Sequence, residues 1–455
     1  MEKTIAAIST APAPGGIGIV RISGGEAFAV AEKVFRGVSG KKLSQMKGYT
    51  AQLGGAYTPA GEKLDDVVAL VYRGPKSYTG EDVVELSCHG GLYMTKRLLQ
   101  LVLDAGAAPA GPGEFTRRAF LNGKMDLAQA EAVMGLISAS GEQARKAALA
   151  GSTGVLSRKI ESIKQGLLEQ AAHLAAWADF PEEDVPQVEE AALLEGIRQG
   201  EKALEELLQG FDRGRMYREG LVTVIAGRPN AGKSTLMNLL SGCQRSIVTQ
   251  YAGTTRDVVE ETVMVAGVPL RLADTAGIRD TDDPVESIGV QAARQRLETA
   301  QLVLAVFDSS QALEKEDWEL MDALEKVPAI AIVNKSDLPT RMDVEAIQKR
   351  FEKTVSLSAA TGEGLAALEQ ALSEILDTKD FHPQEGVLFT QRQRMDAQTA
   401  LDSLREGEQA LALGLTLDAV TVCVEDTLHA LAALTGEQVS EEIVDRVFEE
   451  FCVGK

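Results

Sequence analysis

The hydrophobic and polar positions follow three patterns along the chain, and the first covers residues 1–118. Short apolar runs rich in Val and Ile are broken there by glycine and proline. These runs predict a helix over residues 94–104 and four strands, over 4–8, 17–22, 67–72 and 83–87. The mixture is typical of an α+β domain.

The second pattern begins at residue 127 and is helical. Apolar residues recur at the spacing of an amphipathic helix around residues 160–175 and again over about 189–208. An acidic stretch with two prolines, residues 180–188, separates the two helices. Helical spacing returns near the end of the chain, over residues 439–451. We therefore expect an all-α region in two pieces.

The third pattern lies between these helical pieces and alternates strands with helices, as in a doubly wound α/β domain. The expected strands cover residues 221–226, 258–265, 269–273, 302–307, 329–333 and 354–357. Because domains tolerate insertion at surface loops, we expect an α/β domain inserted in a helical domain. The predicted domains are 1–118 (α+β), 119–216 with 381–455 (helical) and 217–380 (α/β, inserted). The alternative layout is four domains in series.

Composition adds limits to this picture of a multidomain α/β protein. The chain has 455 residues, of which 45% are hydrophobic and 25% charged, and this excludes collagen-like and wholly disordered classes. No apolar run approaches the roughly 20 residues of a membrane-spanning helix, and the N-terminus does not resemble a signal peptide. Four cysteines without metal-ligand spacing favour a reduced, cytoplasmic setting.

The net charge of −21 argues by itself against a nucleic-acid partner, because phosphate binding needs clustered Lys and Arg. The charge is uneven, however: +3 over residues 1–118, −9 over 217–380 and −15 over the rest. The small positive excess over residues 1–118 is only a weak electrostatic footprint for a nucleic acid.

Residues 227–234, called the phosphate loop below, read GRPNAGKS and match the GxxxxGK[ST] motif. They lie between a predicted strand and a predicted helix over 235–240, which is the context that the motif requires. Backbone N–H groups of such a loop cradle phosphate oxygens. Lys233 is expected to reach the β- and γ-phosphates and Ser234 to ligate Mg²⁺. The alternative is a chance glycine-rich turn.

A base-recognition motif follows the predicted strand over 329–333. Guanine offers an N1–H and an exocyclic amine, two donors that the carboxylate of Asp337 can accept, whereas adenine cannot satisfy it. Asn334 and Lys335 complete the motif, which on its own could also be a polar helix cap. Three residues after the last strand are expected to support the base edge: Ser358, Ala359 and Ala360. These motifs resemble those of translation-factor-type GTPases.

The segment before residue 300 carries the expected hydrolytic machinery. Asp274, Thr275, Ala276 and Gly277 resemble the Mg²⁺ and γ-phosphate sensor of GTPases, and Thr255 is the expected Mg²⁺-sensing hydroxyl. Ras-type GTPases place a water-orienting Gln where this chain has Ile278, so another group must act. The next loop offers four carboxylates, from Asp280, Asp282, Asp283 and Glu286, and two arginines near it could approach the phosphates, Arg256 and Arg279.

The chain as a whole resembles one family, the tRNA-modification GTPases MnmE (TrmE). The resemblance rests on five segments in order around the GTPase-like domain: 15–24, 78–86, 112–116, 118–127 and the final CVGK of 452–455. It implies that Asn230, Thr249, Tyr251 and Thr254 bind K⁺, and that Glu286 orients the attacking water. The expected GTP contacts also include Ala231, Gly232, Thr235, Gln250, Ala252 and Gly253.

The resemblance also implies a folate site in the N-terminal domain. Arg21, Glu85, Lys124 and the C-terminal Lys455 would contact a tetrahydrofolate derivative, 5-formyl- or 5,10-methylene-tetrahydrofolate, which donates one carbon. Without the resemblance, the first two could be surface charges and Lys455 a disordered end. Cys452 could be a nucleophile, a ligand or a packed thiol.

For function, the resemblance implies a K⁺-stimulated GTPase that works with the flavoprotein MnmG (GidA). Together they would install an aminomethyl or carboxymethylaminomethyl group on carbon-5 of the wobble uridine, U34, of certain tRNAs. The chain would form a homodimer through its N-terminal domain, and its GTPase domains would associate when K⁺ and GTP bind, with Arg256 and Arg279 supporting that face. The alternative is a regulatory or ribosome-assembly GTPase switch without modifying chemistry.

Overall fold

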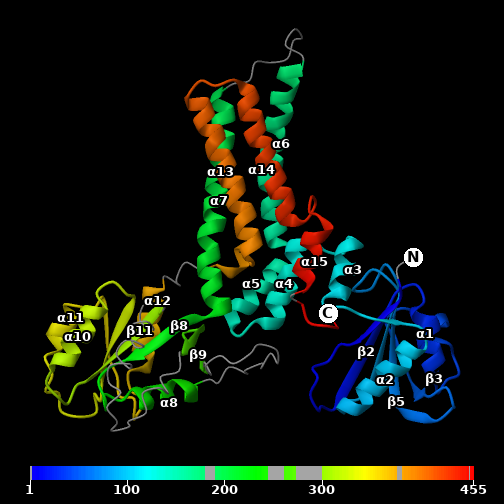
Figure 1. Cartoon of the computed structure of the whole chain (residues 1–455), viewed down its shortest axis with the longest axis horizontal. Coiled ribbons are helices and arrows are strands. Elements are labelled where there is room, and N and C mark those ends of the chain that lie inside the picture. The colour runs from blue at the N-terminus through cyan, green and yellow to red at the C-terminus, as the bar shows by residue number, and fades with distance from the viewer. Residues whose placement is uncertain are drawn as a thin grey trace. The chain divides into compact units, whose positions relative to one another are not determined.

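The structure, a computed structural model, describes residues 3–179, 190–243, 261–272, 300–376, 382–449 and 451–454 (Figure 1). The chain divides into two compact units. The first comprises Met1–Met134, Ile160–Leu194 and Asp402–Lys455, and the second Gly135–Lys159 and Glu195–Leu401. None of the helices in the described part of the chain combines the length and apolar character that a membrane crossing requires.

The first unit contains a seven-stranded sheet with strand order β3-β4-β5-β6-β2-β1-β7. Its strands are β1 (Ile5–Ile8), β2 (Ile17–Ser23), β3 (Phe35–Gly37), β4 (Thr50–Tyr57), β5 (Lys63–Tyr72), β6 (Val83–His89) and β7 (Ala108–Pro109). Its helices are α1 (Ala27–Val34), the short η1 (Leu43–Gln45), α2 (Leu92–Asp104) and α3 (Glu114–Leu121). The predicted α+β class is confirmed, and four strands and one helix fall where the sequence placed them.

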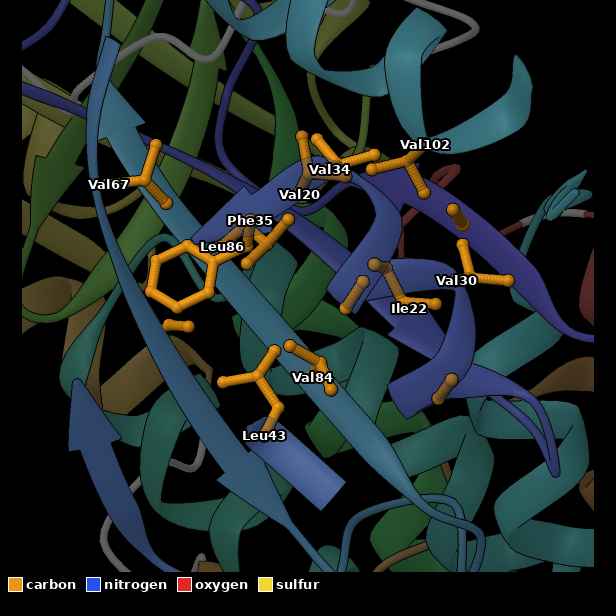
Figure 2. Packing of buried hydrophobic residues seen from close by; sticks show 14 of the residues in the cluster. Val20, Ile22, Val30, Val34, Phe35, Leu43, Val67, Val84, Leu86 and Val102 are labelled. Carbon is orange, nitrogen blue, oxygen red and sulfur yellow. The ribbon is translucent and has the colours of Figure 1, made fainter. Parts of the chain in front are cut away.

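One face of this sheet packs against α1 and α2 in a hydrophobic core (Figure 2). Val20 and Ile22 of β2 and Val84 and Leu86 of β6 are fully buried in it. Because side chains alternate between the faces of a strand, the residues between these pairs point to the opposite face. That alternation explains why Arg21 and Glu85, which are paired in register, lie outside the core.

The helical region follows the second sequence pattern. Its helices are α4 (Leu127–Ser138), α5 (Glu142–Ser152), α6 (Val155–Asp179), α7 (Glu190–Glu219), α13 (Gln391–Ala412), α14 (Leu417–Thr435) and α15 (Glu441–Glu449), with a short η3 at Pro383–Glu385. Helix α7 runs eleven residues beyond the predicted end because Phe211 and Tyr217 continue its buried stripe. The all-α expectation is confirmed.

The end of the chain returns to the N-terminal sheet within the first unit. Phe448 and Phe451 pack with Leu127 in one buried cluster. Beyond them, Val453 forms a β-bridge with Pro112, and the carbonyl of Gly454 accepts a hydrogen bond from the Ser9 hydroxyl at 3.2 Å. The final segment therefore lies beside the end of β1. Strand β1 pairs with β2, and Arg21 of β2 is the register partner of Ala7.

The second unit contains a six-stranded sheet with order β13-β12-β11-β8-β10-β9. All neighbours are parallel except β9 and β10, which form an antiparallel pair. The strands are β8 (Leu221–Ala226), β9 (Glu261–Val265), β10 (Val268–Leu272), β11 (Leu302–Asp308), β12 (Ala329–Asn334) and β13 (Lys353–Ser356). Helices α8 (Lys233–Cys243), α10 (Lys315–Ala323), α11 (Val344–Gln348) and α12 (Leu365–Ile375) complete the doubly wound α/β fold that the sequence predicted.

Candidate nucleotide site and N-terminal cavity

Three of the sequence motifs meet at one edge of the six-stranded sheet. The phosphate loop follows β8, Asn334 ends β12, and residues 358–360 follow β13. Strands β8, β11, β12 and β13 are mutually parallel, so their carboxyl ends share that edge. Ligands of open α/β sheets bind outside the carboxyl ends of the strands. The topology thus assembles a ligand site from segments far apart in the sequence.

The phosphate loop has the backbone conformation of an anion cradle. Asn230 and Gly232 adopt positive φ angles of 61° and 99°. A Cβ on Gly232 would lie 2.1 Å from Nδ2 of Asn334, so only glycine fits there. The Nζ of Lys233 donates to the carbonyls of Gly227 and Arg228 at 2.9 and 2.8 Å. The lysine head therefore already lies over the loop that would hold the phosphates.

Arg228 anchors this loop to α10. Its Nη1 lies 2.7 Å from Oε1 of Glu314, and its Nε lies 2.9 Å from Oδ2 of Asp317. Asp317 is only 2% exposed and also caps α10 by accepting from the backbone N–H of Glu314. Burial lowers the pKa of Arg228, but its two carboxylate partners outweigh that effect and hold the pKa above its ordinary value.

Asn334 joins the phosphate loop to the segment after β13. It is 1% exposed, donates from Nδ2 to the carbonyl of Ala231 at 2.8 Å, and accepts at Oδ1 from the backbone N–H of Ala359 at 2.9 Å. One buried side chain thereby fixes the spacing of two loops. The predicted role of Asn334 as a direct nucleotide contact stays a prediction, whereas its place between the loops is observed.

The other members of the base-recognition motif lie beside it. Oδ1 of Asp337 accepts from the Ser358 hydroxyl at 2.6 Å, which connects the expected guanine carboxylate to the last loop. Lys335 donates from Nζ to Oδ2 of Asp308 at 2.6 Å. Burial raises the pKa of Asp308, but the hydrogen bonds from Lys335 and Ser310 outweigh it and keep that pKa below its ordinary value.

Burial separates the site into a framework and a rim. The framework is buried and consists of Ala231, Asn334, Ser358 and Ala359. The exposed rim consists of Asn230, Ser234, Thr235, Asp337 and Ala360. Several predicted site residues lie outside the described residues: Thr249, Gln250, Tyr251, Ala252, Gly253, Thr254, Thr255, Arg256, Asp274, Thr275, Ala276, Gly277, Arg279, Glu286 and Lys455. The expected roles of these residues stay predictions.

Sequence reasoning missed two contributors to this site. Asp308 ends β11 at the same edge as Asn334, and Arg228 lies inside the phosphate loop. Asp308, like Asn334, is a polar residue at the end of a continuous apolar run, and this signal could have found it. Nothing in the sequence pattern pointed to Arg228, because its partners on α10 are some ninety residues away along the chain.

A second candidate site lies in the N-terminal unit, on the face of the sheet opposite α1 and α2. A cavity of about 240 Å³ is lined by Arg21, Tyr72, Tyr78, Val83, Glu85 and Val133. It combines one cation, one carboxylate and two phenols on an otherwise apolar wall. Such a mixture suits a flat, polar-edged organic ligand.

Arg21 and Glu85 form an ion pair in the lining of this cavity. Nη2 and Nε of Arg21 lie 2.8 and 2.9 Å from Oε1 of Glu85, and Tyr72 donates to Oε2 at 3.3 Å. The Arg21 guanidinium lies 5.8 Å from the ring centre of Tyr78 and 5.5 Å from that of Phe115. Burial, followed by the nearby Glu85 charge, raises the pKa of Tyr72, so its phenol stays a donor. The alternative of a lone surface cation does not describe Arg21.

Of the other predicted folate residues, Lys124 lies within the described residues and Lys455 does not. Lys124 is exposed and donates to the carbonyl of Pro75 at 2.9 Å, and it is not among the residues that line the cavity. The carbonyl of Cys452 accepts from the N–H of Gly113, and its side chain is half-buried. The structure thus brings Arg21 and Glu85 together, whereas Lys124 is bonded to the loop that contains Pro75.

Two family models match the chain. The model described as GTP-binding protein TrmE N-terminus matches residues 4–124, and that of the MnmE helical domain matches residues 127–452. The tRNA modification GTPase MnmE of Alkaliphilus oremlandii is 43% identical over 459 residues, and that of Symbiobacterium thermophilum is 45% identical over 457. Each alignment covers 100% of both proteins. The crystal structure of the G domain of the T. maritima FeoB iron transporter is 28% identical, with coverage of 34% of this chain and 98% of that one and a TM-score of 0.27.

Proposed function

The chain belongs to the MnmE family of tRNA modification GTPases. From this membership we propose which ligand each of its two candidate sites binds. The chain is a GTP hydrolase with a role in tRNA modification. GTP binds at the carboxyl edge of the six-stranded sheet, and the N-terminal cavity holds a tetrahydrofolate derivative. With a flavoprotein partner, the protein adds an aminomethyl or carboxymethylaminomethyl group to carbon-5 of the wobble uridine, U34, of certain tRNAs.

One observation carries the nucleotide assignment: Asn334 ties the phosphate loop to the loop that supports Asp337. The two loops that would hold the two ends of GTP thereby have a fixed separation. Asp337 is exposed at the rim, where its carboxylate can accept from both donors of guanine. Titration with GTP, inosine triphosphate and ATP tests this assignment, with GTP expected to bind most tightly. Equal affinity for GTP and ATP would remove Asp337 from base recognition.

Two cations are proposed at the phosphate loop, and its residues fit them. Ser234 presents an exposed hydroxyl at the start of α8, a ligand that suits Mg²⁺. Asn230 presents an exposed amide on a left-handed turn, and its carbonyl oxygen suits a hard ion such as K⁺. When bound, these cations supply positive charge next to the phosphates. Thr249, Tyr251 and Thr254 complete the proposed K⁺ set, and Thr255 the Mg²⁺ set. Turnover in K⁺ should exceed turnover in Na⁺, and equal rates would reject the ion site.

Glu286 is the proposed group that orients the attacking water, because Ile278 cannot form hydrogen bonds through its side chain. A Glu286→Ala variant should keep GTP binding and lose most turnover. Arg256 and Arg279 are proposed to support the face through which GTPase domains associate when K⁺ and GTP are bound. Unchanged turnover in the Glu286 variant would assign the water to another residue.

The N-terminal cavity supports the folate proposal through its chemistry. Glu85 can accept N–H groups of a pterin ring, the rings of Tyr72 and Tyr78 offer flat surfaces, and Arg21 offers donors. When bound, 5-formyl- or 5,10-methylene-tetrahydrofolate supplies one carbon. Lys124 and Lys455 are proposed at the edge of the site, with Cys452 nearby. Calorimetric titration of tetrahydrofolate into the nucleotide-free protein should show saturable binding that Arg21→Ala weakens.

A homodimer through the N-terminal domain is supported by the same open face of the sheet. Leu53 and Val68 are opposite each other in register and are 57% and 40% exposed, and Ile17 is 65% exposed. Apolar side chains gathered on one sheet face favour coverage by a second copy. Light scattering should give a dimer mass that a Leu53→Asp, Val68→Asp variant loses.

The partners proposed outside the chain are the flavoprotein MnmG (GidA) and tRNA, with the reaction in the cytoplasm. The chain carries a net charge of −21, so the partner would supply most contacts to tRNA phosphates. The competing function is a regulatory or ribosome-assembly switch without modifying chemistry. Arg21 and Glu85 argue against it, because a simple switch needs no charged, aromatic cavity outside the GTPase domain. Absence of folate binding would favour the switch.

A further inference from the structure

The end of β11 contributes two buried polar residues to which the proposed function assigns no role. Asp308 is 5% exposed and Ser309 is 1% exposed. Asp308 is the last of the seven buried residues of β11 and Ser309 follows it directly, so both lie at the edge where the nucleotide is proposed to bind. Buried polar side chains need hydrogen-bond partners, so the identity of those partners shows what the residues hold.

Within the described residues, Ser309 forms its hydrogen bonds with the base-recognition motif, residues 334–337, and with the loop that follows it. The N–H of Ser309 donates to the carbonyl of Asn334 at 3.0 Å, and its hydroxyl donates to the carbonyl of Lys335 at 3.0 Å. Its own carbonyl accepts from the N–H of Arg341 at 2.8 Å. Ser309 therefore binds the backbone of this segment before and after Asp337.

Asp308 binds the side chain of Lys335, in the same base-recognition motif. Oδ2 accepts from Nζ of Lys335 at 2.6 Å, while Oδ1 accepts from the N–H and hydroxyl of Ser310 at 2.9 and 2.6 Å. Both carboxylate oxygens are thus satisfied without a ligand. The Lys335 side chain remains 31% exposed, so its methylene groups can contact a ligand at the exposed rim of the site.

Lys335 needs this support because its backbone is in the left-handed region, at a φ of 62°. A lysine rarely adopts that conformation unless its surroundings impose it. The turn sets the direction of the next two residues and therefore the position of the Asp337 carboxylate. The contacts from Ser309 and Asp308 act on the backbone and on the side chain of this one residue.

We propose that Asp308 and Ser309 are positioning residues for guanine recognition. They hold the turn at Lys335 so that the Asp337 carboxylate faces both the N1–H and the exocyclic amine of the base. The inference rests on the proposed nucleotide site, and it adds that selectivity for guanine depends on residues that do not touch the base.

The test compares the affinities for GDP and for inosine diphosphate, which lacks the exocyclic amine. Wild type should bind GDP more tightly. Asp308→Asn and Ser309→Ala should each raise the Kd for GDP roughly tenfold, the size of one lost hydrogen bond to a charged group, and raise that for inosine diphosphate less. The matched control is Asp322→Asn, which removes an exposed ion pair with Arg350 and should leave both constants unchanged.

The ratio of the two affinities separates the possible results. A variant that weakens both nucleotides equally, with the ratio of wild type, would make Asp308 and Ser309 merely structural and overturn the proposal. Lack of discrimination in wild type itself would instead contradict the proposed role of Asp337. The thermal unfolding midpoint is measured for each variant to establish that it folds. If Asp308→Asn fails to fold, the ratio measured with Ser309→Ala decides alone.

Discussion

Asn334 donates its side-chain amide to the carbonyl of Ala231 at 2.8 Å, across 103 residues of sequence. The bond is buried, and Oδ1 of the same side chain accepts a hydrogen bond from the backbone N–H of Ala359. The phosphate loop and the loop after β13 are therefore held by one side chain, whose removal affects both.

Replacing Asn334 with Ala should weaken both the fold and the site. The change leaves the Ala231 carbonyl and the Ala359 N–H without this partner in a buried place, a loss of about 1–3 kcal/mol for each group. Urea unfolding should show the lower free energy, and nucleotide titration a Kd for GTP at least tenfold higher. Gln370→Ala, which removes an exposed amide bonded to Glu374, is the control. Unchanged GTP binding in the Asn334 variant would mean that the two loops keep their spacing without it.

Gly232→Ala should abolish tight GTP binding. The new Cβ would lie 2.1 Å from Nδ2 of Asn334, and the φ of 99° strains any other residue. Gly242→Ala is a matched control in the following helix, where a Cβ meets nothing within 4 Å. Because alanine favours a helix, the control should bind GTP normally and gain about 0.4–1 kcal/mol of stability. If both variants bind GTP alike, the close approach of Gly232 and Asn334 does not matter to the ligand.

Arg228→Ala should reduce GTP affinity through the shape of the phosphate loop. The variant frees the loop from α10 and leaves the buried Asp317 without its cationic partner. A cost of about 1–3 kcal/mol is expected for the lost charged hydrogen bonds, and Arg228→Lys should recover part of it. Kd values and thermal midpoints measure the two effects. Arg350→Ala removes the more exposed pair with Asp322 and serves for comparison; an equal loss in both variants would deny Arg228 a special role.

The Asp308–Lys335 pair should give a pH-dependent contribution to stability. The pKa of Asp308 is lower in the folded protein than its ordinary value of 3.8. The pair therefore contributes its full stabilisation at pH values above about 3.8 and loses it as the pH falls through the lower, folded-state pKa. Urea unfolding of wild type and Asp308→Asn should differ by a constant amount from pH 7 to 5, and the difference should shrink in more acidic solution. If the difference grows on acidification, the pKa of Asp308 is raised in the folded protein rather than lowered.

Much of this architecture could be predicted from sequence periodicity alone. The strands at 221–226, 302–307 and 329–333 are recognisable because each is a continuous apolar run of parallel-sheet length. Strand β4 was missed because its residues 50–57 include two adjacent glycines and no clear alternation. Its place in the sheet comes from pairing with β5, which local sequence does not encode.

The site was predictable where function fixes a local motif and not where it depends on tertiary contacts. Lys233 and Asp337 stand in motifs that can be recognised in one dimension. The partners of Arg228 and the Arg21–Glu85 pair depend on packing and strand register. Tyr72 and Tyr78 were not predicted as cavity residues for the same reason.

The most direct test of the whole account measures wobble nucleosides in tRNA from cells that lack this protein. Complementation with wild type should restore the carbon-5 modification of U34. Arg21→Ala should keep GTP hydrolysis in the purified protein but fail to restore the modification, because the N-terminal cavity carries the one-carbon chemistry. Full restoration by Arg21→Ala would contradict the account and leave the chain as a GTPase whose cavity takes no part in the modification.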